Sequence, residues 1–141
     1  MGEIIDGLKQ RGRPAALVYA SDHGENLLDD DSKLFGHGIG NNRDLVSAAF
    51  IWLSDGLRNK LPEMSNSAED HASASLSLSN LPHSWLDLAG IEVSNLDRSL
   101  SIFSPTFSER ERWHLVNGSL TSEYDEIFQK NSLRGRSANS Q

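Results

Sequence analysis

The sequence predicts an α/β fold, and three observations support this prediction. Two short apolar runs, at residues 15–20 and 47–53, each end abruptly in polar residues. Continuous apolar runs of this length are typical of strands that are buried on both faces of a parallel sheet. Helical patterns lie before the first run and after the second, and a hairpin pattern lies near the C-terminus. We therefore expect helices with a mostly parallel sheet, plus a C-terminal β-hairpin.

The first two helix predictions concern residues 3–9 and 55–60. In the first segment, Ile4, Ile5 and Leu8 recur at helical spacing, and basic residues follow them. The first segment has no capping residue or earlier turn before it, so we expect the last turns of a longer helix.

A third helix is predicted at residues 80–90. Asn80 stands at its start as a capping residue, a proline follows two residues later, and Gly90 marks the end. The helix would bury an apolar stripe made of Leu81, Trp85 and Leu88. The three tryptophans, Trp52, Trp85 and Trp113, are spaced as core residues of separate elements.

Two polar stretches interrupt these elements. Residues 65–80 form a Ser-rich run of low complexity, and residues 131–141 form a polar tail that we expect to be disordered. Between them, strand-like runs at 113–116 and 120–124 flank Asn-Gly at positions 117–118. Asn-Gly between two such runs is a strong signal for a β-hairpin.

Composition excludes several classes of function. The chain has 141 residues, enough for one domain, and its net charge of −7 argues against a nucleic-acid partner. Without cysteine it has no disulfide and no thiolate metal site. No run approaches the roughly 18 apolar residues of a membrane helix. Because the N-terminus shows no basic start and no apolar h-region, we expect that it is not a signal peptide. If Met1 is the natural start, the chain alone is expected to be soluble and cytoplasmic.

The candidate functional residues lie directly after the first predicted strand. Asp22 and His23 follow that strand, and Gly24 lets the backbone turn sharply. Ligands of open α/β sheets bind beyond the carboxyl ends of strands. A carboxylate next to an imidazole offers two donor types that suit zinc. The alternative interpretation is a pair of hydrogen-bonded loop residues.

Five histidines are present, and one besides His23 is a candidate. His37 lies fourteen residues beyond His23 between two glycines, so it is accessible and can return to the same strand end; a histidine without a partner is the alternative. We expect His71 to be solvated, His83 to lie on a helix surface or in a satisfied packing position, and His114 to face one side of the hairpin.

The remaining candidates are weaker. Glu25 and the aspartates at 29–31 form an acidic cluster that could recruit a cation, although a solvated loop is the more common outcome. Serines are numerous, but none stands in a Gly-x-Ser-x-Gly elbow or a similar setting. No catalytic nucleophile is therefore identified in this chain.

A resemblance to a known family adds to these observations. Residues 15–26, Ala-Ala-Leu-Val-Tyr-Ala-Ser-Asp-His-Gly-Glu-Asn, resemble the metal-binding strand of the phosphoethanolamine transferases, which belong to the alkaline phosphatase and sulfatase superfamily. Five further segments match that family in the same order, at residues 34–38, 50–55, 85–91, 98–100 and 124–125. Together the matches cover roughly residues 1–128.

The resemblance implies roles for individual residues. Asp22 and His23 would bind zinc, and His37 would contact the transferred phosphate group or a second metal. The threonine nucleophile of the family would lie upstream of this chain, so the chain alone is expected to be inactive. Residues 1–130 would form the C-terminal portion of a sulfatase-like catalytic domain, a fragment of a three-layer sandwich, and residues 131–141 would form the disordered tail.

The resemblance also implies an activity. A complete enzyme would move phosphoethanolamine from phosphatidylethanolamine to a cell-envelope acceptor, such as lipid A, the lipopolysaccharide core or a periplasmic glucan. It would be anchored in the inner membrane with its catalytic domain in the periplasm. Two alternatives stay open: a hydrolase of sulfate or phosphate esters from the same superfamily, and a non-catalytic remnant of such an enzyme.

Overall fold

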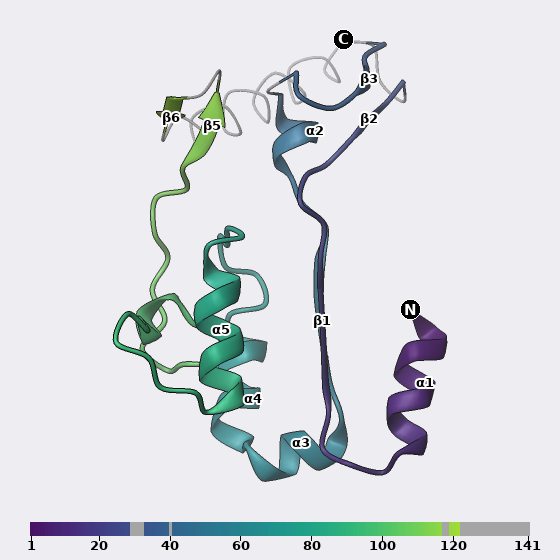
Figure 1. Ribbon diagram of the computed structural model, residues 1–141, viewed down its shortest axis with the longest axis vertical. Helices are drawn as coiled ribbons and strands as arrows, with labels where there is room; N and C mark the ends of the chain where they lie inside the picture. Colours follow the sequence, from purple (N-terminus) through teal and green to yellow (C-terminus); the bar gives the residue numbers. More distant parts are fainter. Residues whose placement is uncertain (29–32, 40, 117–118, 122–141) are drawn as a thin grey trace, which may run out of the picture. The chain divides into compact units, whose positions relative to one another are not determined.

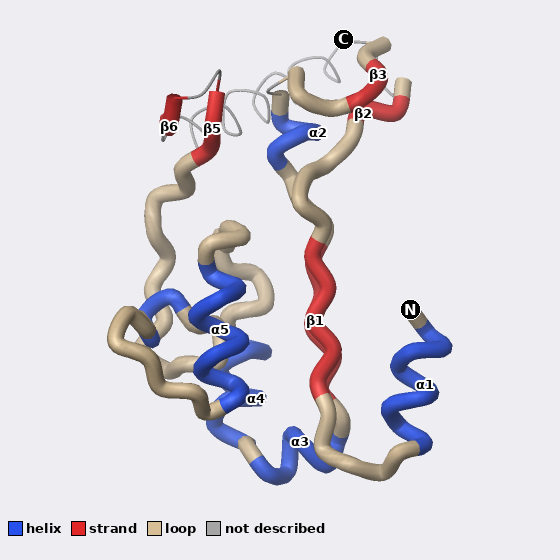
Figure 2. Tube along the Cα trace, viewed as in Figure 1, coloured by secondary structure: helices blue, strands red, loops and turns tan. Residues whose placement is uncertain are grey.

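A computed structural model describes residues 1–28, 33–39, 41–116 and 119–121. The chain divides into two compact units. The first unit comprises residues 1–20 and 49–110, and the second comprises residues 21–48 together with the described part of 111–141. Figure 1 shows the order of the elements along the chain, and Figure 2 shows which of them are helices and strands. The two units are described separately.

Two strands in the first unit confirm the predicted apolar strands. They are β1 (Ala16–Ala20) and β4 (Ala49–Leu53), and they pair with Val18 opposite Ile51. The expected burial on both faces is not seen, because Leu53 is the one buried residue of the two strands. The pairing is antiparallel, so the prediction of parallel neighbours is wrong for these two strands. Ser21 N–H donates to the Ala48 carbonyl at 2.9 Å, so the chain that leaves β1 returns at the same end. A parallel partner would need a crossover to the opposite end.

The helical elements of the first unit match most of the expected positions. They are α1 (Gly2–Gln10), α3 (Asp55–Lys60), α4 (Pro62–Asp70), α5 (Asn80–Ala89) and the 3₁₀ turn η1 (Arg98–Leu100). Ser54 caps α3, because its hydroxyl accepts the Leu57 N–H at 3.2 Å. The same hydroxyl accepts the Ala15 N–H at 2.9 Å, which connects the start of α3 to the segment that precedes β1.

Helix α5 ends as predicted but begins differently. Gly90 adopts the left-handed conformation, with φ of 67°, and terminates the helix. Asn80 is not its cap, since it is the first residue of the helix and lies buried. Its side chain accepts the Ser77 N–H and donates to the Leu100 carbonyl, each at 2.9 Å. Asn80 therefore fastens the start of α5 to η1.

The predicted apolar stripe of α5 is only partly correct. Leu88 packs against the core, but Trp85 is 51% exposed. The side of α5 that is fully buried carries small or polar residues instead, among them Ser84. Its hydroxyl donates to the Asn80 carbonyl at 2.8 Å and accepts the Ile102 N–H at 3.2 Å. A hydroxyl at this position lets the backbone near Ile102 approach the helix closely.

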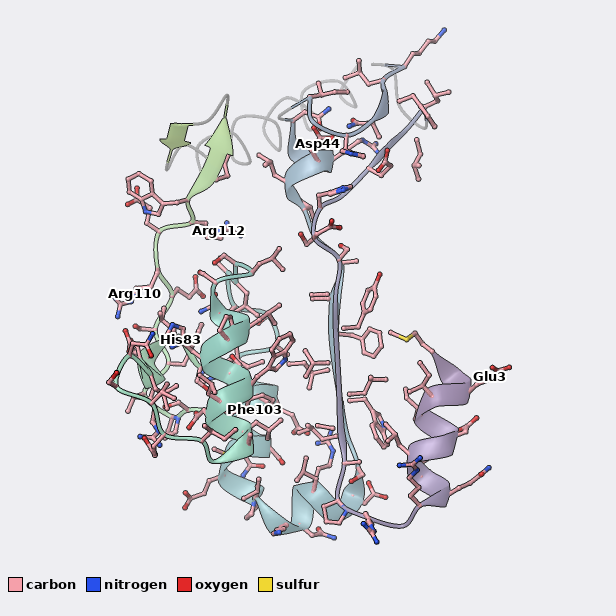
Figure 3. The ribbon with its side chains drawn as sticks, viewed as in Figure 1. Glu3, Asp44, His83, Phe103, Arg110 and Arg112 are labelled. Atoms are coloured by element: carbon pink, nitrogen blue, oxygen red, sulfur yellow. The ribbon has the colours of Figure 1, made fainter. Side chains whose placement is uncertain are left out.

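The core of the first unit is small. Leu53, Ile102 and Phe103 are its buried apolar residues, and Phe103 is completely inaccessible to solvent (Figure 3). Partly buried side chains surround them, including Ile51 from β4 and Met64 from α4. The core thus joins both strands, through Ala16 of β1 and Leu53 of β4, to the helices that follow β4.

The Ser-rich run is more ordered than predicted. Helix α4 extends to Asp70, and both Ser65 and Ser67 are buried in it. The prediction that His71 is solvated is also wrong. Its Nδ1–H donates to the Ile102 carbonyl at 2.9 Å, and its ring lies 4.6 Å from that of Phe107 between centroids. The small serine side chains allow this helix to pack closely.

The predicted C-terminal hairpin is confirmed. It consists of β5 (His114–Val116) and β6 (Ser119–Thr121), which pair antiparallel. Its Asn-Gly turn, the matched residues 124–125 and the predicted tail at 131–141 lie outside the described residues. Trp113 just before β5 is 57% exposed, so it is not the core residue that its spacing predicted. No helix in the described part of the chain is long and apolar enough to cross a membrane.

The burial of Phe103 predicts a large effect on stability. We expect Phe103→Ala to lower the free energy of unfolding by about 3–5 kcal/mol, because it empties the centre of the core. Phe35→Ala is the control, since Phe35 is 73% exposed; we expect it to change stability by about 0.5 kcal/mol or less. Urea titration followed by circular dichroism measures both. Equal effects of the two substitutions would contradict the described core.

Candidate metal centre

Two short strands and a short helix build the candidate site in the second unit. Strands β2 (Asn26–Leu27) and β3 (Phe35–Gly36) pair antiparallel, with Asn26 opposite Gly36. Helix α2 (Asn42–Leu45) follows them. His23 lies shortly before β2 and His37 lies directly after β3. Because the strands are antiparallel, the end of β3 returns to the start of β2, and the two histidines meet there.

Three side chains gather at this point. The rings of His23 and His37 lie 4.1 Å apart between centroids. His37 Nδ1–H donates to Glu25 Oε2 at 3.1 Å. One potential ligand atom from each of His23, Glu25 and His37 lies within 4.8 Å of the others. Among the described residues, this is the one group of three or more histidines and carboxylates close enough to hold a metal ion.

Hydrogen bonds orient both imidazoles. His23 Nδ1–H donates to the Gly24 carbonyl at 2.7 Å, so its Nε2 is the nitrogen left to bind a ligand. His37 Nδ1–H is held by Glu25, which leaves its Nε2 in the same role. A carboxylate that holds the second nitrogen of a histidine is common around protein metal sites, because it fixes the ring and increases its basicity.

The surroundings also change the acidity of His23. The hydrogen bond to the Gly24 carbonyl favours the protonated ring and raises the pKa of His23 above its ordinary value of 6.5. Partial burial of the ring works in the opposite direction. The nearby carboxylates of Asp22 and Glu25 raise the pKa further. The site is therefore electronegative, as a site that attracts a cation should be.

Asp22 lies beside this group. Its side chain is 89% exposed, and Oδ2 is 3.7 Å from His23 Nε2. Its other oxygen accepts the backbone N–H of His23 at 3.1 Å. The structure thus brings the predicted residues His23 and His37 together and places Asp22 next to the free nitrogen of His23.

Glu25 is the residue that the sequence interpretation placed elsewhere. It was grouped with the aspartates at 29–31, which lie outside the described residues. Its place two residues after His23 is the sequence signal that could have marked Glu25 as part of the site. Its contact with His37, however, depends on the pairing of β2 with β3. That pairing is carried by two residues on each side, too few to show a strand pattern.

The other histidines have different surroundings. His71 is used in packing, as described above. His83 Nδ1 accepts the Asp97 N–H at 3.0 Å, which agrees with the predicted satisfied position. His114 lies in β5, as predicted.

The donor set fits zinc. Two imidazole nitrogens and a carboxylate oxygen are ordinary zinc ligands, and all three side chains are partly or fully exposed. Three protein donors leave further coordination positions for water or a substrate, as catalytic zinc sites do.

Sequence comparisons identify the relatives of this chain. The sequence model of the sulfatase family matches residues 1–91. The phosphoethanolamine transferase EptC of Escherichia coli strain K12 is 31% identical over 116 residues, which cover 80% of this chain and 20% of EptC. The phosphoethanolamine transferase CptA of Salmonella typhimurium strain LT2 is 33% identical over 100 residues, or 69% of this chain and 17% of CptA. The chain thus spans about a fifth of the length of these curated relatives.

Solved structures agree with the sequence comparison. The zinc complex of the C-terminal periplasmic domain of Escherichia coli EptC matches with a TM-score of 0.73 and 28% identity, over 86% of this chain and 35% of that domain. The corresponding domain of EptC from Campylobacter jejuni matches with a TM-score of 0.62 and 26% identity, over 77% of this chain and 34% of that domain. With an α/β fold like that of the EptC domain and a sulfatase match over residues 1–91, this chain belongs to the sulfatase family.

Proposed function

We propose that this chain supplies part of the zinc site of a phosphoethanolamine transferase. The observation that carries the proposal is the group of His23, Glu25 and His37, found in a chain that resembles the zinc complex of an EptC domain. Both its curated relatives and its structural neighbours are phosphoethanolamine transferases.

The proposed roles follow from the hydrogen bonds. His23 binds the metal through Nε2, and Asp22 supplies an oxygen next to it. His37, oriented by Glu25, presents its Nε2 to the transferred phosphate group or to a metal. When bound, zinc polarises phosphoryl oxygens and lowers the pKa of an attacking hydroxyl. The protein contributes the fixed direction of the two imidazoles.

The proposed donor is phosphatidylethanolamine, and the proposed acceptor is a glycan or lipid of the cell envelope. The names of the curated relatives support transfer of phosphoethanolamine. The periplasmic domains among the structural neighbours support a periplasmic catalytic domain, which we propose is anchored to the inner membrane in the full-length enzyme.

We also propose that residues 1–130 belong to a three-layer sandwich with a mostly parallel sheet, followed by a disordered tail at 131–141. Two observations in the first unit support a larger sheet. Within the described residues, β1 pairs along one edge only, with β4. An open apolar groove of about 480 Å³ lies along β1 and α5 and includes the exposed Trp85. Further strands and helices would cover both.

The nucleophile is proposed to come from outside these 141 residues. Ser21 stands next to Asp22, but its hydroxyl accepts the Ala48 N–H at 2.9 Å. No serine stands in a motif that marks a nucleophile. A second candidate function is hydrolysis of sulfate or phosphate esters, which the match to the sulfatase family favours. The two differ in whether water or a hydroxyl of another molecule receives the phosphoryl group.

The proposed site predicts a specific pattern of zinc affinity. We expect His23→Ala and His37→Ala each to weaken zinc binding at least about tenfold, because each removes an imidazole nitrogen. Glu25→Gln should weaken it by about 10–100-fold, as loss of a carboxylate that orients a histidine usually does. Isothermal titration of the full chain with zinc measures each affinity. His83→Ala is the control and should bind like wild type; equal affinity of all four variants would exclude this site.

The proposed activity predicts that the chain needs a partner sequence. Residues 1–141 alone should transfer no phosphoethanolamine, since a covalent route requires a nucleophile. A chimera in which this chain replaces the matched segment of Escherichia coli EptC should transfer it, as mass spectrometry of the acceptor would show. His23→Ala should abolish transfer by the chimera, and His83→Ala should preserve it.

Three outcomes of this experiment would contradict the proposal. Release of phosphoethanolamine to water without a modified acceptor would favour the hydrolase. A chimera that is folded but inactive, while intact EptC is active, would favour a non-catalytic remnant. Full activity of the His23→Ala chimera would mean that the proposed zinc site takes no part in the reaction.

A further inference from the structure

A buried polar network lies behind the two histidines. Asn26 is 1% exposed and Asp44 is 5% exposed. Figure 3 labels Asp44 on α2. Among the described residues of 21–48, these two are the ones that are buried. A carboxylate is costly to bury unless hydrogen bonds compensate for the lost water. Asp44 must therefore be held by strong partners.

Asn26 and the backbone of Ile39 hold the Asp44 carboxylate, and Asn26 is held in turn by further bonds. Asp44 Oδ1 accepts from Asn26 Nδ2 at 2.5 Å, and Oδ2 accepts the Ile39 N–H at 2.6 Å. Asn26 Nδ2 also donates to the Gly36 carbonyl at 2.9 Å. Asn26 Oδ1 accepts from Asn41 Nδ2 at 2.7 Å. Both side-chain groups of Asn26 and both oxygens of Asp44 are thus in use.

Two of these bonds enclose His37. The Gly36 carbonyl precedes His37 and is held by Asn26, while the Ile39 N–H follows it and is held by Asp44. The backbone on each side of His37 is therefore attached to the same buried pair. The backbone of His37 therefore cannot move away from the site without breaking one of these bonds, and the hydrogen bond to Glu25 orients its ring.

The main chain of Asp44 fixes the other histidine. Its carbonyl accepts the Gly24 N–H at 2.8 Å, and the Gly24 carbonyl in turn accepts the Nδ1–H of His23. The approach is very close: a β-carbon on Gly24 would lie 1.8 Å from the Arg43 carbonyl oxygen. Only glycine fits here. Asp44 therefore connects to His23 through its backbone and to the His37 loop through its side chain.

We propose that Asn26 and Asp44 are positioning residues that hold His37 next to His23. Zinc affinity then depends on the hydrogen bond between Asn26 and Asp44. The inference rests on the proposed zinc site. Neither side chain is among the three that gather as potential ligands, so each acts through the histidines. Loosening the pair should weaken metal binding while every proposed ligand remains in place.

The first test breaks the Asn26–Asp44 hydrogen bond with one substitution and rebuilds it in the opposite direction with two. Asp44→Asn keeps the size of the side chain and an acceptor for the Ile39 N–H. It places an amide NH₂ opposite the NH₂ of Asn26, so two donors face each other and the bond is lost. We expect about 10–100-fold weaker zinc binding, the usual effect of losing a group that orients ligands. The double variant Asn26→Asp/Asp44→Asn exchanges donor and acceptor and should recover part of the affinity. Recovery is incomplete because the bond to the Gly36 carbonyl stays lost and a carboxylate oxygen then faces that carbonyl.

A matched control separates positioning from stability. Asp87 is another buried carboxylate, in the first unit, and accepts from Arg98 Nε at 3.1 Å. Asp87→Asn should lower stability without weakening zinc binding. Circular dichroism establishes the temperature at which each variant is folded, and titrations are run below it. Cobalt(II) added in place of zinc gives a visible spectrum that reports ligand geometry; Asp44→Asn should change it and the double variant should restore it.

Each outcome decides the question. Unchanged zinc affinity and cobalt spectrum in folded Asp44→Asn would overturn the inference, while the His23→Ala result would still support the proposed site. Failure of the double variant to recover any affinity would also overturn it. If Asp44→Asn does not fold, Asn41→Ala removes a partner of Asn26 and should weaken binding several-fold; no change would count against the inference. A wild-type chain that binds no zinc would overturn the proposed function itself.

Discussion

The buried carboxylate of Asp44 is the constraint on which the candidate site depends. The segment that carries the site has little apolar burial to hold it together. None of its large apolar side chains is buried in the described residues: Leu34 and Leu45 are partly exposed, and Leu27, Leu28, Phe35, Ile39 and Val46 are exposed. Hydrogen bonds to the Asp44 carboxylate hold the segment together instead. Such bonds are short and directional, and they define positions more sharply than apolar contacts of the same number would.

This arrangement suits a site that must present polar side chains to solvent. In the proposed site, His23 and His37 must lie at the surface, where a phosphate group and a metal can reach them, so burial cannot fix them. A network beneath them fixes the backbone on both sides of His37 and the residue that follows His23. The same carboxylate adds negative charge close to His23, which is one of the causes of its raised pKa. Structure and electrostatics of the site therefore come from the same residue.

Much of the secondary structure could be predicted from the sequence. Local patterns in the sequence predicted the positions of β1 and β4, the end of α5 at Gly90 and the hairpin around positions 117–118. Such patterns can be recognised in one sequence because they involve only neighbouring residues. The direction of β4 was predicted wrongly, because an apolar run shows burial and carries no information about its neighbour. Trp85 and the serines of α4 were misjudged for a related reason. Whether a tryptophan or a serine is buried depends on what packs against it.

The candidate site shows the same limit. Asp22, His23 and His37 were candidates because of their positions after the first predicted strand and between two glycines, and the resemblance of residues 15–26 and 34–38 to a family suggested their roles. The contact of Glu25 with His37 and the roles of Asn26 and Asp44 were not predicted. They depend on pairing between strands of two residues each, and on hydrogen bonds between positions up to eighteen residues apart. No periodic pattern in a single sequence records such pairings.

X-ray absorption at the zinc edge, measured on the full chain loaded with one equivalent of zinc, tests the central claim most directly. The claim is that the β2–β3 pairing and the Asp44 network assemble a metal site that includes imidazole. We expect the spectrum to show scattering from at least one imidazole ring, with nitrogen at about 2.0–2.1 Å and oxygen ligands beside it. A zinc ion surrounded by oxygen alone, with no imidazole scattering, would contradict the account.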